Sequence, residues 1–563
     1  MNKIMRIRLL KPVFFLLLLA TPLLAQQQTI QPGTDLLSLD TIFRYQPKSL
    51  AGIKWLADGS GYSMLEPSPG KNGSLDIVRY DAATGSRTIL APADKLVPPG
   101  ASSPLMIEAY EFSQDGRKAL LFTNSARVWR SNTRGDYWVL DLKSWELRKL
   151  GGAAAKPSTL MFAKFSPDGM RVGYVRENNI YVESLADGSI VQLTSDGTRH
   201  IINGTFDWVY EEELFCRDGW RWSPDGEQIA YWQLDSEGVK EFQLINDTAA
   251  LYPVITSFPY PKAGETNSAA RVGSVSARGG ETRWFDIPGD PRNHYLARME
   301  WAANSAEVII KQLNRLQNTN MVMLGEIGTG RVRTILTEKD EAWVDVAWGS
   351  IGWDKTGLGR GDVEWLDGGK RFLWVSERDG WRHVYSVSRD GKDLKCITPG
   401  SYDVIGVEKV NESGGWLYFT ASPENATQRY LFRTRLDGAG SAERLSPASE
   451  PGSHDYIISD SGDLAIHTYS TFTSPPETEV VRLPQHEKLR VLIDNRELRE
   501  RLSKIRQGKT KFFRVDIGEG VQLDGWMIEP PDFDPRKRYP VLFHVYGEPW
   551  GQTVLDEWDG LRL

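Results

Sequence analysis

A short turn followed by an alternating strand recurs along the chain. Three copies are nearly identical, and each has Ser, Asp and Gly in the same order. They are Ser113-Gln114-Asp115-Gly116, Ser166-Pro167-Asp168-Gly169 and Ser223-Pro224-Asp225-Gly226. In such a turn Asp bonds its own backbone, and Gly supplies the positive φ that other residues avoid. The runs that follow, at 118–122, 171–175 and 228–232, are short and rich in β-branched and aromatic residues, which predicts half-buried strands.

Weaker copies of the turn extend the repeat over most of the chain. They lie at Asp58-Gly59, Asn304-Ser305, Asp367-Gly368, Gly414-Gly415 and Ser461-Gly462. A spacing of roughly 50 to 60 residues, longer after Asp225, matches one four-stranded blade with its loop. The pattern predicts a mainly β fold, a β-propeller of about eight blades over residues 30–493. A β-sandwich with unrelated hairpins is the alternative, but near-identical copies favour the propeller.

The pattern changes after residue 493. Charged residues at 495–502 predict a linker helix within 494–510, with Glu and Arg at facing spacings. Two short runs, Phe512–Val515 and Gly525–Ile528, predict a hairpin. Tyr539–Tyr546 is almost continuously apolar, as is typical of a strand buried on both faces of an α/β sheet. We therefore expect residues 511–563 to begin a second domain that is incomplete in these 563 residues.

The first 25 residues have the pattern of a signal peptide. Lys3, Arg6, Arg8 and Lys11 precede the apolar run Val13–Ala20, and Leu23-Leu24-Ala25 offers a cleavage site. An uncleaved membrane anchor is the alternative, but the apolar run is well short of the roughly 20 residues that a spanning helix needs. We therefore expect an exported protein, periplasmic or extracellular, with no membrane span after cleavage.

Composition narrows the class of protein. A net charge of −7 over 563 residues, without a concentrated Lys/Arg stretch, argues against a nucleic-acid binder. Twenty Trp with many Gly and Pro suit a β-rich protein with many turns. Cys216 and Cys396 are the only cysteines, so no disulfide framework is expected. The two thiols are interpreted as free and buried, although an oxidising compartment would let them pair.

The segment Asp207–Phe215 is the most unusual in the chain. It reads Asp-Trp-Val-Tyr-Glu-Glu-Glu-Leu-Phe, three adjacent carboxylates between aromatic residues. Adjacent carboxylates repel one another, and a cation between them relieves that repulsion. A Glu triplet by itself is more often a solvated face, so the residues alone leave a binding site and a surface cluster both open.

Several motifs together resemble the dipeptidyl peptidase IV family of serine exopeptidases. The Asp-Trp-Val-Tyr-Glu-Glu-Glu segment is similar to the family signature that interrupts a propeller blade, and Val128-Trp129-Arg130-Ser131 is similar to its arginine-bearing blade. Blocks at 260–265, 313–318 and 377–383 also look like family blocks, in the family's order. The resemblance implies that Glu212 and Glu213 bind the free α-ammonium of a peptide and that Arg130 reaches its backbone carbonyl.

The same resemblance bears on the chemistry. It identifies residues 511–563 as the start of an α/β-hydrolase domain and implies that Tyr546 donates its hydroxyl to an oxyanion hole. In that fold the nucleophile lies in a Gly-x-Ser-x-Gly elbow, followed by Asp and His. No serine has glycine at both positions, and the 17 residues after Tyr546 contain neither Ser nor His. The histidines have no His-x-x-x-His spacing, so neither a metal nor a cofactor is expected.

Three functions fit these observations. The first is a dipeptidyl peptidase IV-like exopeptidase that releases Xaa-Pro or Xaa-Ala dipeptides, of which this chain is a part without the Ser-Asp-His triad and inactive alone. The second is an exported, non-catalytic propeller that binds peptide N-termini. The third is a propeller completed by a separate chain. Peptides with a free N-terminus are the expected partners, and a complete hydrolase domain would favour a homodimer. Related enzymes release dipeptides or tripeptides, and both remain open.

Overall fold

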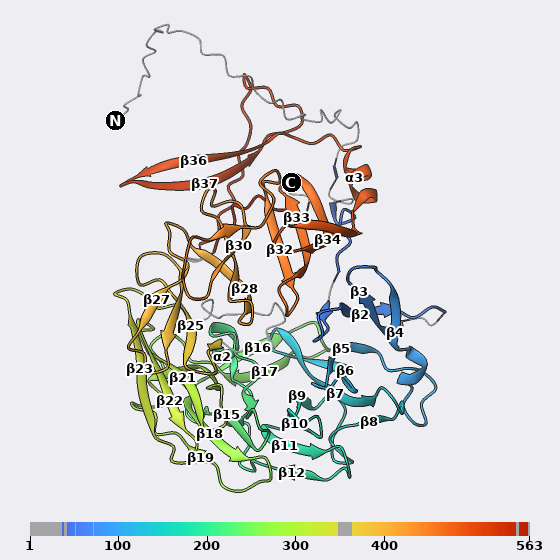
Figure 1. The fold of residues 1–563 in the computed structure, drawn as a ribbon, viewed down its shortest axis with the longest axis vertical. Coiled ribbons are helices and arrows are strands. Elements are labelled where there is room, and N and C mark those ends of the chain that lie inside the picture. Colours follow the sequence, from blue (N-terminus) through green and yellow to red (C-terminus); the bar gives the residue numbers. More distant parts are fainter. Residues whose placement is uncertain are drawn as a thin grey trace.

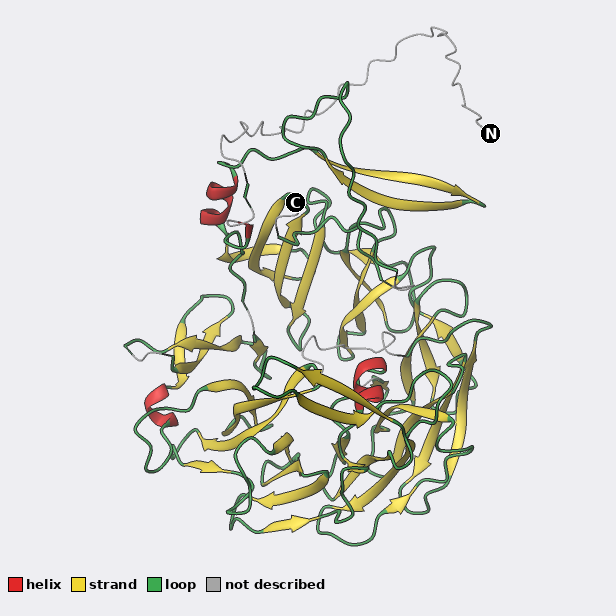
Figure 2. Ribbon diagram, turned by 180° about the vertical axis from the view of Figure 1, so that it is seen from behind, coloured by secondary structure: helices red, strands yellow, loops and turns green. Residues whose placement is uncertain are grey.

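The chain forms repeated antiparallel sheets with few helices. The computed structural model describes residues 37–38, 42–50, 52–70, 73–346, 363–547 and 551–560. The predicted signal peptide, residues 1–25, lies outside these ranges. Figure 1 shows the sheets following one another around the molecule in chain order, and Figure 2 shows how little of the chain is helical. Within the described part of the chain, no helix has the length and apolar character that crossing a bilayer demands.

The strands group into eight blades, of which the second and third are joined by strand pairing into one eight-stranded sheet. The first four blades contain β1 (Lys54–Trp55), β2 (Gly61–Pro67), β3 (Leu75–Asp81) and β4 (Arg87–Ala91); β5 (Ile107–Phe112), β6 (Lys118–Val128), β7 (Ser131–Asp141) and β8 (Leu147–Lys149); β9 (Leu160–Phe165), β10 (Arg171–Arg176), β11 (Asn179–Ser184) and β12 (Ile190–Gln192); and β13 (Ile201–Asn203), β14 (Trp220–Trp222), β15 (Gln228–Asp235), β18 (Ala269–Ser276) and β19 (Arg283–Trp284).

The other four blades continue the order. They contain β20 (His294–Trp301), β21 (Glu307–Asn314), β22 (Thr319–Glu326) and β23 (Val332–Lys339); β24 (Trp365–Leu366), β25 (Arg371–Ser376), β26 (His383–Ser388) and β27 (Leu394–Cys396); β28 (Val404–Asn411), β29 (Trp416–Ala421), β30 (Tyr430–Arg435) and β31 (Glu443–Arg444); and β32 (Ser453–Ile458), β33 (Leu464–Thr471), β34 (Ser474–Arg482) and β35 (Glu487–Ile493).

A few elements lie outside the blades. They are the 3₁₀ helix η1 (Ala93–Leu96), the helices α2 (Trp208–Glu213) and α3 (Arg496–Leu502), and the hairpins of β16 (Glu241–Asn246) with β17 (Val254–Pro259) and of β36 (Thr510–Gly518) with β37 (Val521–Ile528). The predicted hairpin after residue 510 is thus confirmed. The predicted linker helix forms as α3, but the ion pairs of its charged side chains run to other elements, as from Lys48 to Glu497 at 3.1 Å.

The repeated turn lies between the first two strands of a blade, except in the fourth blade, where it joins the second strand, β14, to β15. In the second blade Ser113 Oγ donates to Asp115 Oδ1 at 2.6 Å, and Asp115 Oδ1 accepts from the backbone N–H of Arg117 at 3.1 Å. Gly116 has a φ of 69°, which favours glycine. The copies at Ser166 and Ser223 have the same bonds. The prediction of about eight blades is confirmed, because the weaker copies of the turn lie at the corresponding position in the other blades.

The hydrophobic core consists of clusters between successive sheets. Among the described residues, eight clusters contain buried residues of two neighbouring blades, as Ile309 of β21 and Phe372 of β25 illustrate for the fifth and sixth. One of these eight joins Tyr62 of the first blade to Ile466 and Val480 of the eighth. A ninth cluster lies outside the blades, around α3. In addition, Trp55 Nε1 donates to the carbonyl of Ile457 at 2.9 Å. The first and last blades therefore pack on each other as the other neighbours do.

Candidate functional site

The site is built around α2, which interrupts the fourth blade between β13 and β14 and lies near the middle of the ring of blades (Figure 1). Asp207 begins the helix: its carboxylate accepts from the backbone N–H of Tyr210 at 3.1 Å, which satisfies one of the free donors of the first turn. Ser268 Oγ of the same blade donates to the other carboxylate oxygen at 2.6 Å. The N-terminus of α2 is therefore fixed to its own blade.

Tyr210 fixes the orientation of the helix. Its ring is 2% exposed and stacks on Phe206 with centroids 5.5 Å apart. Its hydroxyl accepts from the backbone N–H of Leu296 in β20 at 3.0 Å. Because one side chain is buried and hydrogen-bonded to the fifth blade, the remaining faces of this short helix have defined directions.

The three glutamates of the triplet have three different environments. Glu211 is buried, and its Oε1 lies 3.6 Å from Nε of Arg217. Burial raises the pKa of Glu211 to about 7, and Arg217 opposes the shift. Glu212 is half-buried, while Glu213 is exposed. Partial burial and the charge of Glu212 raise the pKa of Glu213, and Arg130 opposes this. The triplet thus presents two of its carboxylates outward.

Arg130 reaches the triplet from the second blade. It lies with Trp129 in the two-residue turn of the extended hairpin β6–β7, where Val128 pairs with Ser131. Its guanidinium forms an ion pair with Glu212, whose side chain is 20% exposed against 73% for Arg130. The structure therefore brings Arg130, Glu212 and Glu213 together. Part of the positive charge that offsets the three adjacent carboxylates therefore comes from the chain itself: Arg130 pairs with Glu212, and Arg217 lies beside Glu211.

An aromatic cluster from the hairpin β16–β17, whose contacts were not predicted from the sequence, supports both elements. Tyr260, just after β17, lies 4.3 Å from Trp208 of α2 between ring centroids. Phe258 of β17 lies 5.0 Å from Trp129 of the arginine-bearing turn. Phe242 of β16 contacts both hairpin rings. The signal in the sequence was weak, because no local spacing relates these residues to one another.

Tyr546 is not part of this cluster. The segment 539–547 has no strand, and its side chains are exposed, 89% at Leu542 and 60% at Tyr546. The prediction of a buried strand over Tyr539–Tyr546 is therefore wrong for this structure. A strand buried on both faces needs paired neighbours and covering helices, and the described residues place neither beside it. No interaction of the described residues joins Tyr546 to Arg130 or Glu212.

The two cysteines do not pair. As predicted, neither forms a disulfide; Cys216 is buried, and Cys396 is half-buried rather than buried. Cys216 Sγ donates to the carbonyl of Ala297 at 3.2 Å, which links the end of the α2 segment to β20.

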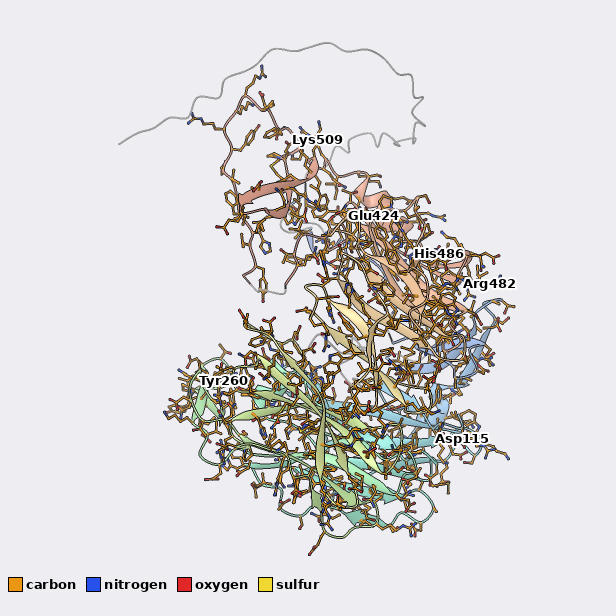
Figure 3. The ribbon with its side chains drawn as sticks, turned by 60° about the vertical axis from the view of Figure 1, so that its left-hand side comes forward. Asp115, Tyr260, Glu424, Arg482, His486 and Lys509 are labelled. Carbon is orange, nitrogen blue, oxygen red and sulfur yellow. The ribbon has the colours of Figure 1, made fainter. Side chains whose placement is uncertain are left out.

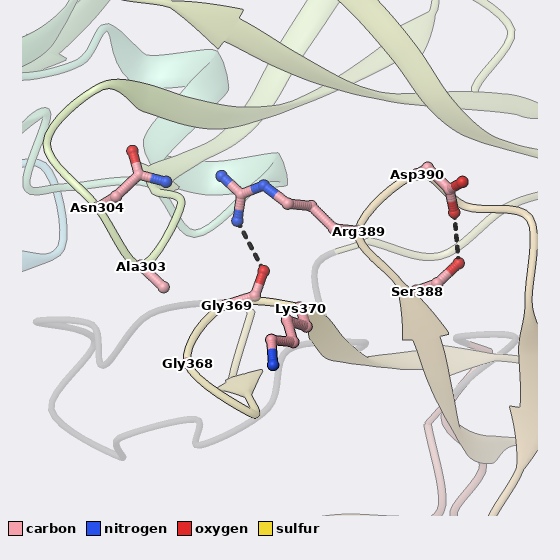
Figure 4. Close-up of a pocket in the computed structure, with 8 residues that line it drawn as sticks. All are labelled: Ala303, Asn304, Gly368, Gly369, Lys370, Ser388, Arg389 and Asp390. Atoms are coloured by element: carbon pink, nitrogen blue, oxygen red, sulfur yellow. Dashed lines mark hydrogen bonds between the residues drawn. The ribbon is translucent and has the colours of Figure 1, made fainter.

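A shallow pocket lies on other elements, among turns of the fifth and sixth blades (Figure 4). Arg389 donates to the carbonyl of Gly369 at 2.8 Å, and Ser388 Oγ donates to Asp390 at 2.7 Å. These three side chains are therefore already partnered within the chain.

Comparison with known proteins gives a consistent result. The family model described as the dipeptidyl peptidase IV (DPP IV) N-terminal region matches residues 113–476. The crystal structure of Porphyromonas gingivalis dipeptidyl peptidase 4 superposes with a TM-score of 0.84 and 29% sequence identity, covering 94% of this chain and 72% of that one.

Curated relatives agree. Dipeptidyl peptidase 4 of Trichophyton rubrum is 26% identical over 521 residues, which is 91% of this chain and 64% of the relative. Probable dipeptidyl-aminopeptidase B of Emericella nidulans is 27% identical over 535 residues, 89% of this chain and 57% of the relative. The chain thus spans less than two thirds of the length of each of these relatives.

Proposed function

The chain belongs to the dipeptidyl peptidase IV family, and from that premise we propose that it is the substrate-selecting propeller of an exported serine exopeptidase that releases N-terminal dipeptides. One observation carries the proposal: Arg130 and the outward glutamates Glu212 and Glu213 converge from two blades. Two carboxylates and one guanidinium are complementary to a peptide's α-ammonium and its first carbonyl oxygen.

In the proposal, the α-ammonium binds between Glu212 and Glu213. Partial burial and the neighbouring charge of Glu212 raise the pKa of Glu213, and an ammonium placed there removes the repulsion between the two carboxylates. Arg130 then moves its donors from Glu212 to the peptide carbonyl. An acetylated peptide brings no positive charge, so it leaves the two carboxylates uncompensated and is rejected.

The chemical step in this proposal is acyl transfer through serine. The serine oxygen attacks the carbonyl carbon of the second residue, the oxyanion accepts a hydrogen bond from Tyr546, and the amine of the third residue leaves with a proton. Water then hydrolyses the acyl-enzyme and releases the dipeptide. The 563 residues contain no Gly-x-Ser-x-Gly elbow. The nucleophile, acid and base are therefore proposed to come from sequence outside them, with residues 511–563 as the start of the hydrolase domain.

A second candidate is a propeller that binds peptide N-termini without cleaving them. The observation that favours it is that Arg130 and Glu212 are already paired within this chain, whereas the segment around Tyr546 is exposed. Binding and hydrolysis measured on the same chain distinguish the two.

The test compares a Xaa-Pro peptide with a free N-terminus and its N-acetylated form. We expect the 563-residue chain to bind the free form at least about 10-fold more tightly, since one charge-assisted contact is worth about 1.5–3 kcal/mol. The double variant Glu212→Ala/Glu213→Ala removes this preference in the chain, and it abolishes dipeptide release in the complete enzyme. Isothermal titration calorimetry and release of a chromogenic Xaa-Pro substrate measure the two effects.

Glu424→Ala is the matched control, because this glutamate has a side chain 77% exposed on the seventh blade (Figure 3). This variant should leave both the preference for the free N-terminus and the release of dipeptides unchanged. A double variant that still distinguishes free from acetylated peptides would contradict the proposed ammonium site.

A further inference from the structure

A stack of histidines in the eighth blade lies apart from the site around α2. His454 of β32 and His467 of β33 are 0% and 1% exposed, and their rings stack with centroids 5.1 Å apart. The backbone register places Tyr456, His467 and Glu479 in one row across β32, β33 and β34. His486, in the turn between β34 and β35, lies against His467 with centroids 4.6 Å apart.

The hydrogen bonds of His454 determine which ring nitrogens carry protons. His454 Nε2 lies 2.9 Å from the carbonyl oxygen of Glu450, which only accepts, so this nitrogen carries a proton. Desolvation favours the neutral form of a fully buried imidazole, so His454 Nδ1 has a lone pair. That lone pair lies 2.9 Å from His467 Nε2, which therefore donates.

This series of hydrogen bonds leaves a lone pair of His467 facing a carboxylate. With its proton on Nε2, neutral His467 presents the bare Nδ1 to Glu479 Oε1 at a distance of 3.1 Å. Two acceptors at this distance repel each other. The contact therefore requires a cation between the two atoms, which is either a further proton on His467 or a metal ion.

A third ligand distinguishes between these two cations. His467, Glu479 and His486 each offer one ligand atom, and these atoms all lie within 4.8 Å of one another. A proton uses two of the groups, whereas a transition-metal ion uses all three. We propose that His467, Glu479 and His486 form a binding site for Zn²⁺ that ties the turn between β34 and β35 to the body of the eighth blade.

The chemistry of the donors suits zinc. Two imidazoles and one carboxylate are a common protein set for Zn²⁺, with a fourth position open to water. Bonds of about 2.0–2.2 Å hold tetrahedral ligand atoms roughly 3.3 Å apart. The 3.1 Å between His467 Nδ1 and Glu479 Oε1 already fits that spacing. His454 and the carbonyl of Glu450 orient the ring of His467 as outer-shell partners do in zinc sites.

Lys488 already places a cation beside Glu479. Its Nζ lies 2.6 Å from Glu479 Oε2 and 3.1 Å from Glu477 Oε1. The side chain of Lys488 is 49% exposed, so it can keep Glu477 as its partner when an ion binds Glu479. His486 is half-buried, whereas His467 and Glu479 are buried, and Figure 3 shows His486 on the same side of the eighth blade as the exposed Arg482. An ion would therefore enter the cluster from the side of His486.

The test is a zinc titration of the untagged chain after treatment with a chelator, in competition with a chromophoric chelator. We expect one equivalent of Zn²⁺ to bind, and the variants Glu479→Gln and His486→Gln each to lose at least about 100-fold in affinity. Co²⁺ at the same site should show the absorption of a tetrahedral complex. Zn²⁺ should also raise the melting temperature of the unaltered chain but not of the variants.

His200→Gln is the control, because His200 is half-buried in another blade and bonds Ser236 Oγ at 3.1 Å. It should bind zinc normally. Circular dichroism and binding of a free-N-terminus peptide show that each variant is folded. If the unaltered chain binds no Zn²⁺ tightly, the cation between His467 and Glu479 is a proton, and the proposed zinc site is overturned. Equal loss in His200→Gln, or none in His486→Gln, would overturn it as well.

Discussion

At the scale of single residues, burial separates three chemically identical glutamates. Glu211 turns inward toward Arg217 and has a raised pKa, whereas Glu212 and Glu213 face Arg130 and solvent. The difference follows from the helical conformation of α2, because successive residues of a helix point in directions about 100° apart. Only two members of the triplet are therefore available to a ligand.

The state of Glu211 predicts a pH dependence of stability. Its pKa is about 7 in the folded chain and 4.5 as the ordinary value, so the folded state binds the proton more tightly. This contribution to stability is complete below about pH 4.5 and is lost as pH rises through about 7. Glu211→Gln stays neutral and removes it. Relative to this variant, the unaltered chain should lose roughly 1–3 kcal/mol of stability across that range.

Denaturant unfolding of both proteins at several pH values across that interval measures the difference. If the stability difference between them is the same at every pH, Glu211 is not protonated in the folded chain.

At the scale of elements, the hairpin β16–β17 holds two parts of the site in place. Its inner end carries the rings that pack on Trp208 and Trp129, whereas its outer end exposes Leu251 and Tyr252, at 93% and 79%. Arg130 and α2 come from different blades, and aromatic contacts from one hairpin reach both. The distance between the guanidinium and the glutamates therefore depends on this hairpin as well as on the blades.

Removal of the inner ring should weaken peptide binding without changing the charges. We expect Tyr260→Ala to reduce the affinity for a free-N-terminus peptide about 2- to 10-fold, because an aromatic pair is worth about 0.5–1.5 kcal/mol. Tyr260→Phe keeps the ring and should restore the affinity. Calorimetric titration measures both, with Tyr252→Ala at the outer end as the control. Similar losses in Tyr252→Ala and Tyr260→Ala would show that the inner contact has no special role.

At the scale of the whole molecule, the eight blades share one kind of interface. A cluster of buried side chains lies between each pair of neighbours, and the pair formed by the eighth and first blades is no exception. A sheet in such a ring cannot bury both faces alone, so each blade depends on its two neighbours. The contact between Tyr62 and Ile466 joins residues from opposite ends of the propeller.

This arrangement predicts that the same substitution at two different blade interfaces lowers the free energy of unfolding by a similar amount. Ile466 at the last interface and Ile309 between the fifth and sixth blades are both 2% exposed. Each substitution, Ile466→Ala and Ile309→Ala, should cost about 2–5 kcal/mol of unfolding free energy. Urea unfolding measures both. A cost below about 1 kcal/mol at Ile466 alone would mean that the first and last blades separate in solution.

The repeated unit could be predicted from the order of residues alone. Turn geometry depends on residues within five positions of each other, so the Ser-Asp-Gly copies identified the turns, and their count predicted the blades. The motif Asp207–Glu213 likewise contained its own helix start. These features depend only on residues close together in the chain, so they can be predicted from the order of residues.

Which distant groups meet depends on how the strands and blades pack, and the order of residues does not show it. Arg130 with Glu212, Tyr260 with Trp208, and the histidine cluster each join separate strands or blades. No His-x-x-x-His spacing announces the cluster, because its members come from two strands and a turn. For the same reason the prediction of a buried strand at Tyr539–Tyr546 was wrong. Such an apolar run becomes a buried strand only where neighbouring strands pair with it and other elements cover its faces. Burial is a property of the whole arrangement, not of a segment.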